Sequence, residues 1–170
     1  NDAPIANITS GETDEDQSIS ITLSGSDIDN DPLTFSLLSD ASNGSVAIDG
    51  TLATYVPNLD FYGSDSFEFI VSDGELTDSE TVTITVNAVN DAPVLSEIDE
   101  QAIDEDNVFN YELIATDVDD IDLSYSATVD GHASIDVTGS TLTITPDLNY
   151  NGNIEVDVTV NDGELSDSDS

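Results

Sequence analysis

The chain has 170 residues, of which 38 are aspartate or glutamate and none is lysine or arginine, so its formal net charge at pH 7 is −38. Without cationic side chains it cannot neutralise phosphates, which excludes nucleic acid and direct contact with an anionic membrane as partners. The absence of cysteine excludes disulfides, thiol catalysis and thiolate metal sites.

A high net charge is typical of disordered chains, yet the apolar residues, 37% of the total, are regularly spaced. Ile19, Ile21 and Leu23 alternate with polar residues, and so do Phe67 and Phe69. Alternation with a period of two gives a β-sheet one apolar face that can be buried. The sequence therefore predicts a folded all-β protein in which cations or bulk salt offset the repulsion between carboxylates.

Seven short strands are predicted in residues 1–89, separated by turn sequences such as Asp49-Gly50 and Asp73-Gly74. In chain order they are Ile5–Ile8, Ser18–Leu23, Leu33–Leu38, Ser45–Ile48, Thr51–Val56, Ser66–Ser72 and Thr81–Val86. No segment has a convincing helical period. Seven strands in about 90 residues are typical of an immunoglobulin-like or cadherin-like β-sandwich.

The tetrapeptide Asn-Asp-Ala-Pro begins at Asn1 and again at Asn90, which divides the chain into two copies of one unit. The copies correspond along most of their length. Asp27-Ile28-Asp29, for example, has its counterpart in Asp117-Val118-Asp119, at a spacing of 90. We therefore predict two tandem sandwich domains, residues 1–89 and residues 90–170, in an elongated rod.

The second unit repeats only six of the predicted strands. They are Val94–Glu97, Val108–Ala115, Leu123–Thr128, Ala133–Val137, Thr141–Thr145 and Ile154–Val160. The sequence ends at Ser170, before a counterpart of Thr81–Val86, so we expect this unit to lack its last strand and the chain to be part of a longer array. A sheet without its last strand exposes apolar surface and an unpaired edge, and the second unit should be the less stable.

Acidic residues gather in the loops between these strands. Successive strands of a sandwich run in opposite directions, so alternate loops lie at opposite ends. We expect a metal site at the joint of the two units, formed by Glu15, Asp60, Asp65, Asn90, Asp91, Asp117, Asp119 and Asp162. A second, half-built set at the start of the first unit consists of Asp2, Asp27, Asp29 and Asp73.

The chemistry of these residues favours Ca²⁺ as the cofactor. Oxygen ligands without histidine or cysteine suit Ca²⁺ better than a transition metal. Two carboxylates one residue apart, such as Asp117 and Asp119, repel each other unless a cation lies between them. For Asp65 the alternative is a structural role in its turn.

Several of these motifs resemble those of a known family. The Asp27-x-Asp29 pair, the Ser72-Asp73-Gly74 turn and the Val89–Pro93 linker resemble the calcium motifs of cadherin repeats. The phrase Pro-Asn-Leu-Asp-Phe-Tyr-Gly-Ser-Asp-Ser-Phe at Pro57–Phe67 is similar to that of bacterial cadherin-like tandem repeats of large surface proteins and RTX-type adhesins. The chain departs from animal cadherins at Ala88, where they have an acidic residue.

The resemblance covers nearly the whole chain and implies a function. Such repeats act as calcium-stiffened spacers that hold an adhesive domain away from the bacterial cell, with Ca²⁺ at the joint rigidifying the rod. We therefore expect a non-enzymatic extracellular module whose partners are Ca²⁺ and neighbouring repeats of the same chain.

Other functions remain as alternatives. The module could bind polysaccharide or another copy of itself, although the absence of Trp and the presence of only five Tyr leave few stacking surfaces. Catalysis by a nucleophile would have to depend on His132, the only histidine, which we expect on a surface loop. Broad acidity is also compatible with adaptation to high salt.

Overall fold

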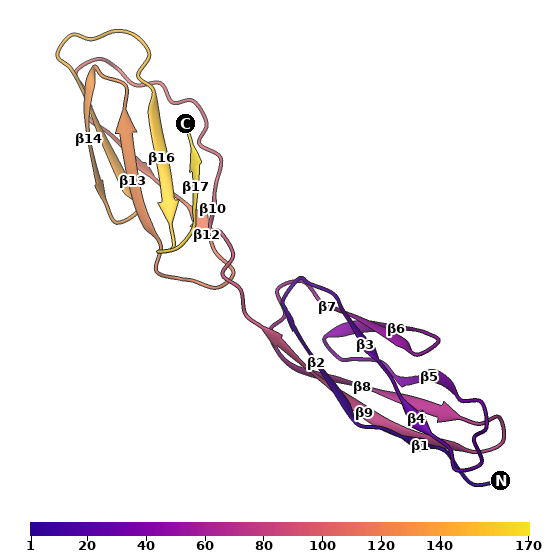
Figure 1. The fold of residues 1–170 in the computed structure, drawn as a ribbon. Helices are drawn as coiled ribbons and strands as arrows, with labels where there is room; N and C mark the ends of the chain where they lie inside the picture. The colour runs from indigo at the N-terminus through magenta and orange to yellow at the C-terminus, as the bar shows by residue number, and fades with distance from the viewer. The chain divides into compact units, whose positions relative to one another are not determined.

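The computed structural model describes residues 1–170 and consists of β-strands joined by turns and loops (Figure 1). It contains no helix long and apolar enough to cross a membrane. The chain divides into two compact units, Asn1–Val89 and Asn90–Ser170. The all-β fold predicted from the alternating apolar residues is confirmed.

The first unit is a sandwich of two main sheets. Its strands are β1 (Ile5–Ala6), β2 (Thr9–Asp14), β3 (Ile19–Thr22), β4 (Gly25–Ser26), β5 (Thr34–Ser39), β6 (Gly44–Asp49), β7 (Leu52–Pro57), β8 (Gly63–Ser72) and β9 (Thr77–Asn87). One sheet has the order β2-β9-β8-β5 and the other β3-β7-β6, while β1 and β4 form a short pair. The core contains inward residues of both sheets, among them Ile21, Tyr55, Phe69 and Ile84.

The hairpin of β6 and β7 turns where the sequence predicts. Asp49 pairs with Leu52, so the loop has two residues, and Gly50 has a φ of +59°. A positive φ costs glycine little because it has no Cβ, and Asp-Gly is a common turn pair for this reason. The matching hairpin of the second unit turns at Gly139, whose φ is +62°.

β2 was not predicted, although it completes the larger sheet. It pairs in parallel with the second half of β9, from Thr9 opposite Val82 to Asp14 opposite Asn87. Its sequence, Thr-Ser-Gly-Glu-Thr-Asp, has no apolar alternation and so gives no strand signal. Gly11 lets it lie close to the core, since a Cβ there would come within 2.6 Å of the Cδ1 atom of Ile21. β9 is therefore enclosed on both edges, by β2 and by β8.

The second unit repeats this plan with shorter sheets. Its strands are β10 (Val94–Leu95), β11 (Phe109–Glu112), β12 (Ala115–Thr116), β13 (Ser124–Val129), β14 (Ala133–Thr138), β15 (Thr141–Pro146), β16 (Val156–Asn161) and β17 (Ser166–Asp169). Its sheets have the orders β11-β15-β14 and β13-β16-β17, and β10 pairs with β12. The core is smaller, with Leu95, Leu113, Leu142, Val158 and Val160 buried.

The last strand within the second unit is β17, Ser166–Asp169, which pairs with β16 as the start of β9 pairs with β8. What has no counterpart is the second half of β9, residues 81–87. Correspondingly, residues 99–104, which match β2, are not a strand.

We expect amide hydrogen exchange to be slower in β8 and β9 than in β16 and β17. The second half of β9 contributes Val82, Ile84 and Val86, each at most 3% exposed, to the first core. Burying one such side chain stabilises a fold by about 1.5–3 kcal/mol, and the second unit has no residues in these places. Exchange measured by NMR should therefore rank the units in this order. Equal or slower exchange in β16 would contradict the ranking.

Candidate metal sites

Asp27, Asp29 and Asp31 form an acidic cluster at the end of the first unit where the chain begins. Oδ1 of Asp27 accepts hydrogen bonds from the backbone N–H of Asp29 (2.8 Å) and of Asp31 (3.3 Å). Carboxylate oxygens of the three residues all lie within 4.8 Å of one another. Oδ2 of Asp27 is buried and has no hydrogen-bond donor. The cluster thus concentrates negative charge around one oxygen that no protein group satisfies.

The first two residues of the chain attach to this cluster. The backbone N–H of Asp2 donates to Oδ2 of Asp29 (2.8 Å), and the side-chain amide of Asn1 donates to Oδ2 of Asp73 (3.0 Å). The terminal ammonium group of Asn1 lies 4.0 Å from Oδ2 of Asp29. The predicted residues Asp2, Asp27, Asp29 and Asp73 therefore come together.

The second unit builds the same arrangement from the matching residues. Oδ1 of Asp117 accepts the N–H groups of Asp119 and Asp120, both at 2.8 Å. The N–H of Asp91 donates to Oδ2 of Asp119 (2.8 Å). Oδ2 of Asp117 is again buried without a donor. We call this acidic cluster, around Asp27 and Asp29 in the first unit and around Asp117 and Asp119 in the second, the cup. Each unit forms its cup from its own first residues and its own loops.

The linker asparagine completes the second cup. The side-chain amide of Asn90 donates to Oδ2 of Asp162 at 2.8 Å. Oδ1 of Asp162 accepts the backbone N–H groups of Glu164 (2.6 Å) and Leu165 (2.7 Å), which closes the Asp-Gly turn. The structure therefore gathers the predicted residues Asn90, Asp91, Asp117, Asp119 and Asp162 within the second unit.

These hydrogen bonds favour the ionised form of the turn aspartates. The amide of Asn90, followed by the N–H groups of Leu165 and Glu164, lowers the pKa of Asp162 below its ordinary value of 3.8. In the first unit the N–H groups of Leu76 and Glu75 lower the pKa of Asp73 in the same way. Donors that point at a carboxylate stabilise its charged form. Both carboxylates are therefore ionised at neutral pH and available to a cation.

Glu15 and Asp60 lie at the other end of the first unit. Glu15 is only 4% exposed, and its Oε1 accepts the N–H of Val89 at 2.6 Å. Oε2 of Glu15 is buried without a donor. Asp60 has a φ of +56°, and its N–H donates to Oδ1 of Asp16 at 3.1 Å. Asp16, which we did not predict as a site residue, belongs to this end as well; its place beside Glu15 was the available signal.

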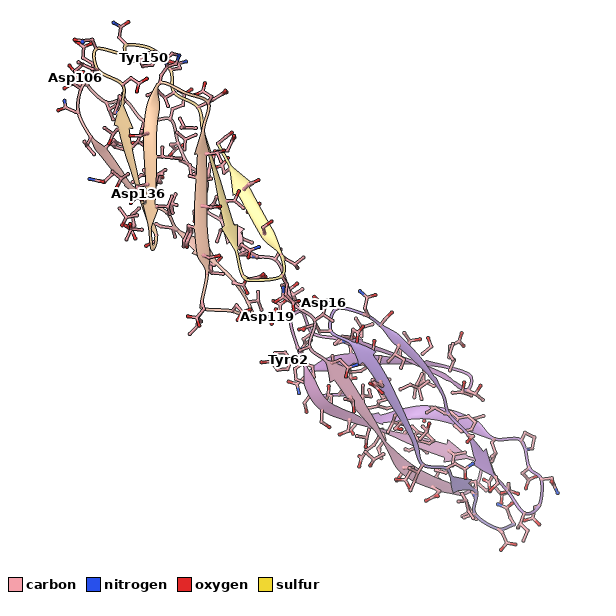
Figure 2. All side chains as sticks on the ribbon, turned by 60° about the vertical axis from the view of Figure 1, so that its left-hand side comes forward. Asp16, Tyr62, Asp106, Asp119, Asp136 and Tyr150 are labelled. Atoms are coloured by element: carbon pink, nitrogen blue, oxygen red, sulfur yellow. The ribbon has the colours of Figure 1, made fainter.

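The corresponding end of the second unit has fewer carboxylates. Glu105, which matches Glu15, is exposed, and Asn149 stands where the first unit has Asp60. Oδ1 of Asp106 accepts the N–H of Asn149 at 2.7 Å. Figure 2 shows Asp106 and Tyr150 together at this end of the second unit and Asp119 at its opposite end. The cup is therefore the feature that the two units share.

Asp65 has a structural environment. It is 6% exposed, and its Oδ2 accepts the hydroxyl of Tyr55 (3.0 Å) and the N–H of Asn43 (2.9 Å). Its Oδ1 accepts the N–H of Ser42 at 3.1 Å. Burial, together with the hydrogen bond to Asp65, raises the pKa of Tyr55, so the hydroxyl stays protonated and donates. Because donors occupy both oxygens, we leave Asp65 out of the proposed metal site.

His132 lies on the surface, as expected. It is exposed, has a φ of +63° and stacks on Tyr150 with ring centroids 4.2 Å apart and an interplanar angle of 7°. The stack explains how a loop residue with an unusual backbone conformation is held in place.

The chain belongs to the bacterial Ig domain family, which it matches over residues 1–85 and again over residues 90–170. A relative with an assigned activity is chitinase A of Pseudoalteromonas piscicida, 32% identical over 161 residues. The aligned part is 92% of this chain but 19% of the chitinase. The likeness therefore concerns a minor part of that enzyme.

Solved structures place the fold among cadherin domains. Domains EC1-2 of human protocadherin-24 match with a TM-score of 0.65 at 20% identity, over 99% of this chain and 92% of that one. Domains EC1-4 of Drosophila N-cadherin match with a TM-score of 0.63 at 21% identity, over 98% of this chain and 48% of that one. The predicted immunoglobulin-like and cadherin-like fold is thereby confirmed. At this level of identity the likeness is one of fold.

We expect the variant Asn90→Ala to raise the pKa of Asp162 toward 3.8, because it removes the largest cause of the lowered value. Since the folded pKa is depressed, the stabilisation from Asp162 is present above the unfolded value and is lost as the pH falls through the folded pKa. An NMR titration of the carboxyl carbon measures the shift, and Asp73 in the same sample is the control. An unchanged titration of Asp162 would contradict the role of Asn90.

Proposed function

We propose that this tandem of bacterial Ig-like domains is a non-enzymatic, calcium-binding spacer of an extracellular or cell-surface protein. The observation that carries the proposal is the buried carboxylate oxygen without a donor, present at Asp27 and again at Asp117. Two units of one chain have kept the same acidic cup around that oxygen. A turn needs only one carboxylate oxygen to accept backbone N–H groups, so turn formation leaves the second oxygen unexplained.

Electrostatics supports a cation as the missing partner. A buried charge is costly unless it is paired, and this chain has no lysine or arginine that could pair with it. The neighbouring carboxylates of each cup increase the cost further, because like charges repel. An ion from solution removes both penalties at once.

The donor set of the second cup fits Ca²⁺. Asp91, Asp117, Asp119 and Asp162 offer carboxylate oxygens, and Asn90 offers an amide oxygen. Ca²⁺ prefers six to eight oxygen ligands and tolerates irregular geometry, and water can supply the remaining positions. The first cup offers Asp2, Asp27, Asp29 and Asp73 with Asn1, and would hold an ion in the same way.

The linker is the part of the chain on which such ions would act. On one side, the N–H of Val89 is held by the carboxylate of Glu15. On the other side, Asn90 and Asp91 are held by Asp162 and Asp119. Consecutive linker residues are thus anchored by acidic groups of both domains. We propose that Ca²⁺ bound by the cup residues of the second unit, and Ca²⁺ bound by Glu15 and Asp60 of the first, neutralises these groups, so that the linker becomes rigid.

The family and the chitinase relative support the setting of this function. A bacterial Ig domain that recurs as a minor part of a chitinase is suited to a large, multidomain protein that acts outside the cell. In such a protein the partners of this module are Ca²⁺ and neighbouring domains of its own chain. The resemblance of its motifs to those of RTX-type adhesins supports the same partners.

We expect 10 mM Ca²⁺ to raise the melting temperature of the second unit and the variant Asp117→Asn to lose most of that response. For a dissociation constant of about 10⁻⁴–10⁻³ M, the stabilisation is about 1.4–2.7 kcal/mol per site. Asparagine keeps the size of the side chain and an acceptor for the N–H groups of Asp119 and Asp120. Heteronuclear NMR in EDTA and in Ca²⁺ resolves the response unit by unit.

The matched control is Asp157→Asn, which removes the same charge from an exposed position on β16. It should respond to Ca²⁺ like the unchanged chain. Small-angle scattering on the same samples tests the rigid linker, since Ca²⁺ should narrow the distribution of interatomic distances. An identical response of the two variants, or no response of the unchanged chain, would contradict the proposal.

Polysaccharide binding is a second candidate, favoured by the relationship to part of a chitinase. Non-catalytic domains of such enzymes can hold the enzyme on its substrate. We expect a pull-down with crystalline chitin and cellulose to decide between a binding module and a spacer. Saturable retention on chitin in the presence of EDTA would establish binding independent of Ca²⁺. If the chain is retained neither in EDTA nor in Ca²⁺, polysaccharide binding is contradicted and the spacer function stands.

A further inference from the structure

The parallel pairing of β2 with β9 joins the first and the last long strand of the first unit. Six residue pairs connect them, from Thr9 opposite Val82 to Asp14 opposite Asn87. The chain enters the unit through residues 1–8, directly before β2, and leaves it through the linker, directly after β9. Figure 1 shows β9 running toward the linker, and the parallel register gives β2 the same direction. Both strands therefore run from the entry of the unit to its exit.

This direction decides how tension along the chain acts on the two strands. Tension from the side of residues 1–8 pulls β2 backward, toward its own beginning, whereas tension from the linker pulls β9 forward, toward its own end. In parallel strands these two pulls are opposite and lie along the strand axis. All hydrogen bonds between the strands then share the load, because sliding one strand past the other must break them together. A pull that separates the strands from one end breaks them one pair at a time.

The neighbouring pairings place the load on β2 and β9. Before β2, the pair of β1 and β4 has only two residue pairs, Ile5 with Ser26 and Ala6 with Gly25. On the other side of β9, ten residue pairs connect it to β8, and its inward side chains belong to the core. Tension therefore detaches β1 first and leaves β9 attached to β8. The step that limits unfolding is the sliding of β2 along β9.

The attachment of β2 to β9 depends mainly on the backbone. The sequence of β2, Thr-Ser-Gly-Glu-Thr-Asp, contributes no apolar side chain to the core. At the end of the ladder the side-chain amide of Asn87 donates to Oε1 of Glu12 and to Oδ1 of Asp14, both at 3.2 Å. Covering the edge of β9 does not by itself favour a parallel strand, since parallel pairing is slightly weaker per residue than antiparallel pairing. The direction of β2 is thus the property that suits it to bear tension.

We propose that the six-pair ladder of β2 and β9, which we call the clamp, holds the first unit together when the chain is pulled from both sides. The tension is that of the proposed spacer function, on which this inference rests, because a spacer transmits the pull between the parts on either side of it. The clamp consists of hydrogen bonds within the chain and needs no ion. It therefore resists force without Ca²⁺, unlike the linker.

The hydrogen bonds of the clamp can be weakened one at a time. The N–H of Glu15, directly after β2, donates to the carbonyl of Asn87 at 2.9 Å. Because the N–H groups of alternate residues in a strand point the same way, the N–H of Thr13 points toward β9 and that of Ser10 points away from it. Thr13→Pro removes one donor of the clamp. Ser10→Pro is its control, because it removes an N–H on the open edge of the sheet, where proline is tolerated.

The test pulls single molecules of the whole chain in EDTA, in two directions set by pairs of introduced cysteines. The chain has no cysteine of its own, the three positions used are exposed, and the second unit carries no load. Handles at Ala3→Cys and Ala88→Cys load the clamp along its strands. Handles at Ala3→Cys and Glu75→Cys, which lie at one end of the unit, open the clamp from that end. We expect the first direction to need a roughly fivefold higher unfolding force, because about six bonds break together and not in turn.

The proline variants show whether the clamp itself bears this force. Thr13→Pro should lower the force in the first direction by roughly a fifth, since it removes one of about six bonds, and should leave the second direction nearly unchanged. Ser10→Pro should change neither. A role in stability alone would lower the force equally in both directions. The proposal is overturned by equal forces in the two directions, or by proline variants that act alike. Because EDTA removes Ca²⁺, either outcome is independent of the melting experiment that tests the Ca²⁺ sites.

Discussion

The interaction on which most of this structure depends is the hydrogen bond from a backbone N–H to a carboxylate. With 38 acidic residues and no lysine or arginine, the chain has almost nothing else that could stabilise its negative charges internally. Asp78 accepts the N–H of Ala6 at 2.8 Å, and its counterpart Asp167 accepts the N–H of Leu95 at 2.9 Å. A hydrogen bond to an ionised acceptor is stronger than a neutral one, so acidic side chains can organise turns and strand ends.

Metal binding is proposed for carboxylate oxygens that are buried and accept no hydrogen bond. Asp27 and Asp117 each use one oxygen to close a turn and leave the other buried without a donor. Asp65 is the opposite case, since its oxygens are occupied by N–H groups and by the hydroxyl of Tyr55. The same residue type is thus structural where donors surround it and a candidate ligand where they are lacking.

The two units also show how much one strand contributes to a small sandwich. Residues 81–87 cover the core and pair on both edges, and with them β2 and the start of β8 are strands in the first unit. Residues 90–170 form their hairpins and their acidic cup without such a segment. These turns and clusters form because their hydrogen bonds are local.

The sequence by itself determined the repeat, the all-β class and most strands, because alternation and Asp-Gly turns are local signals. It also predicted that Asp117, Asp119, Asp162 and the linker residues belong together, since strand order places their loops at one end. Only the tertiary structure decided that Thr9–Asp14 is a strand, because its partner β9 is distant in sequence and its own residues are polar. The tertiary structure also showed that the oxygens of Asp65 accept hydrogen bonds from the protein, which removes Asp65 from the candidate metal ligands. It showed in addition that Asp16 lies beside Asp60. Whether a carboxylate meets a donor depends on which backbone groups the fold brings to it, and no pattern along the chain contains that information.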